Sequence, residues 1–73
     1  MEEKIKRLND IKEDVGFDLY RKAVTRVVAS YYSKVLSNRG KKVKRTEVWD
    51  RTNLKLKELG LEEVSYEFMR TVV

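Results

Sequence analysis

The chain has 73 residues, of which 40% are charged, and its 17 Lys and Arg outnumber its 12 Asp and Glu to give a net charge of +5. It contains no Cys and no His, which excludes a disulfide framework, a thiolate metal site and acid–base chemistry by histidine. We therefore expect no metal, no cofactor and no enzymatic activity. The length predicts a single domain, residues 1–73, with a marginal core that self-association would reinforce.

The hydropathy pattern argues against membrane insertion or secretion. No apolar run is long enough to cross a bilayer, and Met1 is followed directly by Glu2 and Glu3, unlike a secretory leader. We therefore expect an intracellular, cytoplasmic, soluble protein. The high charge, together with the absence of Gln and the presence of only three Asn, resembles the composition of proteins from hot environments.

The first segment predicts an amphipathic helix. Its apolar residues recur every three or four positions, at Ile5, Leu8, Ile11 and Val15. Gly16 suits the left-handed position just past a helix end, and Asp18 is expected to cap the next helix. The two helices should therefore pack as close neighbours across a very short connection.

Residues 18–38 predict one long helix around which the other elements are organised, because the stretch has no Pro or Gly and carries adjacent apolar pairs every four residues. A repeat of four drifts about 40° per step on a helix, so the apolar stripe winds around it and its two ends need different partners. We expect an all-α, short-long-short domain that dimerises around this helix. The predicted dimer residues are Ala23, Val24, Val27, Val28, Tyr31, Tyr32 and Val35.

Two of these residues have an alternative interpretation. Tyr31 and Tyr32 could stack on bases or, as tyrosines, act as a covalent nucleophile. Their place in the periodic apolar stripe favours packing in the core.

A basic loop follows the long helix. Val43 is expected to anchor this loop in the core, and Arg45 precedes Thr46, the expected N-cap of a third helix. The loop could neutralise nucleic-acid phosphates or could be an ordinary solvated turn. The candidate phosphate-binding residues are Arg39, Lys41, Lys42, Lys44 and Arg45.

The third helix is expected to run to Leu59 and to end in a Schellman motif at Gly60 and Leu61. Its buried stripe should comprise Val48, Trp49, Thr52, Leu56 and Leu59. Leu54 falls on the opposite side and should be exposed or part of an interface. The tail, residues 62–73, fits either a short helix capped by Ser65 or a strand, with helix preferred.

Residues 19–48 resemble part of a histone fold. The matching residues of the turn are Arg39, Gly40, Lys41 and Lys42, followed by the apolar Val43 and then by Glu47 and Val48. The resemblance implies phosphate contacts by Arg39, Lys41, Lys42 and Lys44, and obligate dimerisation through the long helix. The chain departs from the family in having Lys42 where Thr is usual, and in the short connection between its first two helices. A fainter resemblance, of residues 41–73 to ribbon-helix-helix modules, ranks below it.

Two functions follow from these observations. The first is a small basic nucleic-acid-binding protein, architectural or regulatory, that holds duplex DNA by its phosphates through the loop after the long helix. The alternative is a helical protein–protein interaction module, or assembly subunit, whose apolar working surface includes Leu54 and the C-terminal segment. Binding that weakens steeply with salt would distinguish the first from the second.

Overall fold

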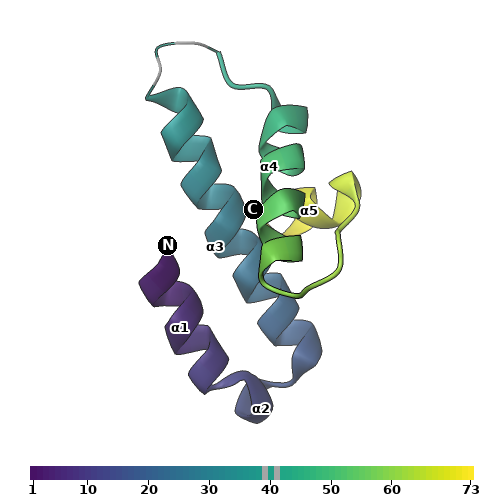
Figure 1. The fold of residues 1–73 in the computed structure, drawn as a ribbon. Helices are drawn as coiled ribbons and strands as arrows, with labels where there is room; N and C mark the ends of the chain where they lie inside the picture. The colour runs from purple at the N-terminus through teal and green to yellow at the C-terminus, as the bar shows by residue number, and fades with distance from the viewer. Residues whose placement is uncertain (39, 41) are drawn as a thin grey trace.

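The structure, a computed structural model, describes residues 1–38, 40 and 42–73 (Figure 1). Its described residues form helices and no strand, which confirms the predicted all-α class. The elements are α1 (Glu2–Asp10), α2 (Lys12–Val15), α3 (Phe17–Ser37), α4 (Arg45–Glu58) and α5 (Tyr66–Val72).

The 21-residue helix α3 is the centre of the fold, and all four other helices contact it. In Figure 1, α1 lies along the first half of α3, and α4 lies along its second half. This arrangement matches the winding of the apolar pairs, since each half of α3 turns a different side to its neighbour. The molecule measures 39 × 24 × 20 Å, an elongation that fits a helix roughly 32 Å long.

The core joins side chains from α1, α3, α4 and α5 and the segment before α5. Thr25 and Thr52 are also fully enclosed, and each hydroxyl donates to the carbonyl four residues earlier, at 2.8 Å and 2.7 Å. Their polar groups therefore stay satisfied away from water. The buried apolar residues are Ile5, Tyr20, Val24, Val28, Ala29, Leu36, Val48, Leu56, Val64 and Met69.

The prediction of one continuous first helix is wrong, because the helix is interrupted at Ile11. That residue leaves helical geometry (φ −109°, ψ 9°) and separates α1 from the single turn of α2. Just before the break, the side chain of Asn9 accepts a hydrogen bond from the Tyr20 hydroxyl of α3. This contact holds the end of α1 against α3 while the chain turns, and it leaves Ile11 and Val15 exposed.

The connection into α3 also differs from expectation. Gly16 has a positive φ, as predicted, but its ψ of 155° is extended rather than left-handed helical. Only glycine adopts this combination readily. Gly16 itself, and not Asp18, is the residue preceding the helix, and Asp18 lies within the first turn. Its carboxylate still faces the positive end of the helix dipole.

The expected burial pattern of α4 is confirmed. Val48, Thr52 and Leu56 are buried and Trp49 and Leu59 half-buried, while Leu54 is 59% exposed. The helix ends as a Schellman motif. The amide of Leu61 donates to the Leu56 carbonyl at 2.8 Å, and the amide of Gly60 donates to the Lys57 carbonyl at 3.0 Å.

Of the two structures considered for the tail, the helix is confirmed. The hydroxyl of Ser65 accepts a hydrogen bond from the amide of Phe68 at 3.1 Å and so caps α5. The ring of Phe68 packs under the guanidinium of Arg21 on α3, with the carbon of that group 4.5 Å from the ring centre. This cation–π contact ties α5 to the long helix.

The start of α1 is joined to α4 by an ion pair. The ammonium group of Lys55 lies 2.8 Å from a carboxylate oxygen of Glu2 and 3.4 Å from one of Glu58. The hydrogen bond from Lys55 holds the pKa of Glu2 below its ordinary value of 4.5. The same bond raises the pKa of Lys55 above 10.5.

Candidate nucleic-acid interface

Three of the five basic residues predicted to contact phosphate lie in the part of the chain that the structure describes. Lys42 and Lys44 are exposed in the connection between α3 and α4, and Arg45 is exposed at the first position of α4. Arg39 and Lys41 fall outside the described residues. The described part therefore holds three cations within four consecutive residues.

Helix α4 begins two residues earlier than expected. Lys44, with extended backbone angles (φ −86°, ψ 131°), is its N-cap, and Thr46 lies in the first turn instead of capping it. Within the described residues no side chain caps this end, and the amides of Glu47 and Val48 both donate to the Lys44 carbonyl. The positive end of the helix dipole therefore lies among the basic side chains and reinforces their potential.

Val43 anchors the loop, as the sequence predicts. Its side chain is half-buried and packs against the core, whereas Lys42 and Lys44 on either side are exposed. An apolar contact of this kind restrains the backbone while the two flanking ammonium groups remain in water. The charges therefore occupy a defined place on the surface.

A recess of about 460 Å³ lies over this loop. It is lined by Lys42, Lys44 and Arg45, by the adjoining Val43 and Thr46, and by Tyr66 from α5. Among the described residues, no carboxylate lines it. The ring of Tyr66 is half-buried and packs edge-on against Trp49, with the ring centres 5.9 Å apart. Three basic groups thus share a recess with an aromatic ring, a combination that suits phosphate and base contacts.

A second recess, of about 330 Å³, extends the positive surface toward α5. Arg45 and Arg70 both line it, although they are 25 positions apart in the sequence. Arg70 is exposed and makes a long ion pair with Glu67 at 3.5 Å, a surface contact that competes weakly with other anions. We call Lys42, Lys44, Arg45 and Arg70 the basic surface. Two acidic residues lie near it in the chain, Glu47 in the first turn of α4 and Glu67 in the first turn of α5.

The sequence interpretation missed Tyr66 and Arg70. Neither belongs to a charge cluster or an aromatic motif along the chain. Both reach the loop only because α5 folds back onto α3 and α4. Periodicity and local charge along the sequence do not predict a contact between segments so far apart in the chain.

The residues predicted for the dimer interface differ in how far their own chain buries them. Val24 and Val28 have no exposed surface, because their own chain encloses them, so they offer nothing to a second copy. Ala23, Val27, Tyr32 and Val35 are half-buried. Tyr31 is 41% exposed, so the preference for packing it in the core is not met. Its ring packs edge-on against that of Tyr32 at 5.2 Å.

Leu54 lies on a different part of the surface. It lines a shallow recess of about 280 Å³ on the outer side of α4, with Asp50, Asn53, Lys57 and Glu63. Charges of both signs surround it, and Lys57 pairs with Glu63 at 2.9 Å. This recess has neither the uniform charge of the basic surface nor a wide apolar lining.

Within residues 1–38, 40 and 42–73, no three acidic side chains gather closely enough to hold a metal ion. No helix of this described part has both the length and the hydropathy to cross a membrane. Comparisons with protein-family models, with curated proteins and with solved structures gave no significant match. The resemblance of residues 19–48 to the histone fold therefore rests on the sequence pattern alone.

Proposed function

We propose that this protein binds nucleic acid, and duplex DNA in particular, by holding phosphates on its basic surface. The observation that carries the proposal is the recess that Lys42, Lys44 and Arg45 line together with Tyr66, and that no carboxylate of the described residues lines. When these side chains neutralise phosphates, the nucleic acid releases its condensed counterions. This release supplies affinity with little sequence preference. Duplex DNA is preferred over RNA because of the partial histone resemblance.

The binding should be weak and non-specific, as expected for an architectural protein. Phosphate contacts carry no base information, and reading a base edge requires bidentate partners such as Asn or Gln placed in a groove. The chain has no Gln and only three Asn. Asn53 is buried and hydrogen-bonded within the fold, and Asn9 accepts from Tyr20. This leaves the exposed Asn38 at the end of α3 as a single amide and not a cluster. Affinity in the micromolar range or weaker at physiological salt is expected.

The test is a binding titration with a labelled duplex and the matching single strand at two salt concentrations. The double variant Lys42→Glu/Lys44→Glu should abolish binding while preserving helicity, because both side chains are exposed. Its control is Lys22→Glu/Arg26→Glu on α3, which lowers the net charge by the same amount at exposed positions away from the basic surface. The control should bind DNA far better than the loop variant.

Other results would redirect the interpretation. If the loop variant binds like the parent protein, the loop is a solvated turn, and the helical interaction module becomes the better hypothesis. If both variants lose binding equally, total charge and not the basic surface is responsible. Stronger binding to the single strand would favour stacking on Tyr66 over duplex recognition.

We also propose that the chain forms a homodimer through the second half of α3. The supporting observation is the partly exposed aromatic pair Tyr31 and Tyr32, with the half-buried Val35 one turn further on. Burying these side chains between two copies would add apolar contact to a small core. Ala23 and Val27 are left out of this contact, because they line a separate recess shared with residues of α1.

A further inference from the structure

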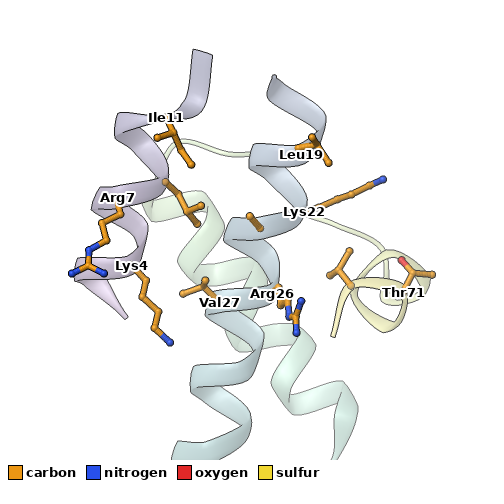
Figure 2. A pocket seen from close by; sticks show the side chains of 11 residues that line it. Lys4, Arg7, Ile11, Leu19, Lys22, Arg26, Val27 and Thr71 are labelled. Carbon is orange, nitrogen blue, oxygen red and sulfur yellow. The ribbon is translucent and has the colours of Figure 1, made fainter. Parts of the chain in front are cut away.

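A wide, mostly apolar recess lies between α1 and α3, away from the basic surface. Its volume is about 630 Å³, and it continues across α3 to Thr71 and Val72 of α5 (Figure 2). Leu19, Ala23 and Val27, spaced four residues apart on α3, contribute to its floor. Leu19 is 60% exposed and Ile11, on the opposite side, is 43% exposed. A stripe of apolar side chains at helical spacing is thus only partly covered by the described residues, most openly at Leu19.

The edges of this groove are uniformly positive. Lys4 and Arg7 line it on the α1 side, and Lys22 and Arg26 line it from α3 (Figure 2). No Asp or Glu of the described residues belongs to its lining. Arg7 makes one exposed contact with Glu3 at 3.4 Å, which is weak enough to be exchanged for another partner. The groove therefore presents an apolar floor between two cationic edges.

We propose that this groove binds an acidic amphipathic helix of another protein. A helix with one apolar face would lay that face on the floor formed by α1 and α3, in the way that helices dock into grooves between helices. Asp and Glu on both flanks of its apolar stripe would meet Lys4 and Arg7 on one side and Lys22 and Arg26 on the other. Opposite charges at such edges orient the partner and speed its association.

The chemistry of the groove disfavours other occupants. A second copy placed groove to groove would bring two identical sets of four cations together, which is repulsive. A sugar–phosphate backbone would satisfy the edges but gain nothing from a floor of Leu, Ala and Val. A lipid surface is best met by a protruding apolar face, whereas this floor is recessed between helices.

The experiment uses a labelled peptide of about 18 residues, long enough to form a helix, with Leu at every third or fourth position and Glu on both flanks. Fluorescence anisotropy should show binding by the parent protein. A peptide of the same composition in scrambled order should bind at least about tenfold more weakly, because it has no continuous apolar face. Equal binding of the two peptides would overturn the proposal by showing attraction between charges alone.

Variants locate the contact. The double variant Lys22→Glu/Arg26→Glu should lower the affinity for the peptide by at least about tenfold, and Leu19→Asp should do the same. Circular dichroism checks that each variant is folded. All three side chains are exposed, so if one variant fails to fold the other still decides the question. The control Lys42→Glu/Lys44→Glu changes the net charge as much as the first variant and should bind the peptide nearly as the parent does. Loss of peptide binding in that control alone would overturn the proposal.

Two further measurements identify a different occupant. Binding to vesicles of phosphatidylcholine and phosphatidylglycerol that is lost in Leu19→Asp, without binding to the peptide, would show a lipid site and refute the helix proposal. An oligomer in light scattering that becomes monomeric in Leu19→Asp would show that a second copy covers the groove, with the same consequence.

Discussion

The side chain of Asn53 on α4 is hydrogen-bonded to both the backbone amide and the backbone carbonyl of Val64. The side-chain oxygen of Asn53 accepts from the Val64 amide at 2.9 Å, and its side-chain nitrogen donates to the Val64 carbonyl at 3.2 Å. The indole nitrogen of Trp49 donates to the same carbonyl at 2.7 Å. These bonds fix the start of the segment that leads into α5, and so they determine where Tyr66 and Arg70 lie beside the basic loop.

Replacing Asn53 with Ala should therefore destabilise the protein by about 1–3 kcal/mol, because the buried amide of Val64 loses its acceptor. Urea denaturation measures the free energy of unfolding, and hydrogen exchange of the α5 amides should rise in particular. Leu54→Ala, at the next position but exposed, is the control and should change stability by less than about 0.5 kcal/mol. Equal effects of the two replacements would mean that the Asn53 bonds do not hold α5.

The salt dependence of DNA binding tests the contribution of Arg70. Four phosphate contacts by the basic surface would give a slope of log K against log salt near −3.6 for duplex DNA. Arg70→Gln should reduce the magnitude of this slope by about 0.9, since one contact is lost. Lys6→Gln, an exposed residue of α1, should leave the slope unchanged. An unaltered slope in Arg70→Gln would restrict the interface to the loop.

The proposed dimer is tested at Tyr31, because its side chain is exposed within one chain. Tyr31→Asp should convert a dimer into monomers, or make the melting temperature depend more strongly on protein concentration. Light scattering measures the mass directly. A parent protein that is a folded monomer at micromolar concentration would refute the dimer.

Val28→Asp serves a different purpose. Val28 has no exposed surface, so an aspartate there would place an unpaired charge in the core of the single chain. We expect a loss of more than about 3 kcal/mol and unfolding, whatever the oligomeric state. Circular dichroism at several protein concentrations measures whether the Val28→Asp variant is helical. A folded Val28→Asp variant would show that the core is arranged differently.

The ion pair between Glu2 and Lys55 predicts a pH dependence of stability. Folding lowers the pKa of Glu2 because of the hydrogen bond from Lys55. Ionised Glu2 therefore contributes fully to the stability of the fold above its unfolded pKa near 4.5, and this contribution is lost as the pH falls through the lower folded pKa. Because the pKa of Lys55 is raised on folding, charged Lys55 contributes fully to stability below pH 10.5, and this contribution is lost as the pH rises through the higher folded pKa. Glu2→Gln should therefore flatten the acid limb of stability against pH, measured by urea denaturation. Glu13→Gln, at an exposed position of α2, should flatten it less.

The sequence by itself determined the long helix, the helix that follows it and several helix ends, because these depend on residues close together in the chain. The apolar pairs of α3 predicted its length, and the wheel of α4 separated the buried Leu56 from the exposed Leu54. Gly60 ends α4 and Ser65 begins α5, each through a hydrogen bond to a residue only three positions away. Such local interactions act whatever the rest of the chain does.

The tertiary structure decided the features that depend on contacts between distant residues. The break at Ile11 coincides with a hydrogen bond between Asn9 and Tyr20 of another helix. The enclosure of Val24 and Val28, which the sequence assigned to a dimer, depends on how the neighbouring helices cover α3. Arg70 comes beside Arg45 only when α5 folds back, and the groove with basic edges exists only when α1 lies against α3. Periodicity tells which face of a helix is apolar, but packing alone decides which part of that face its own chain covers and which part remains for a partner.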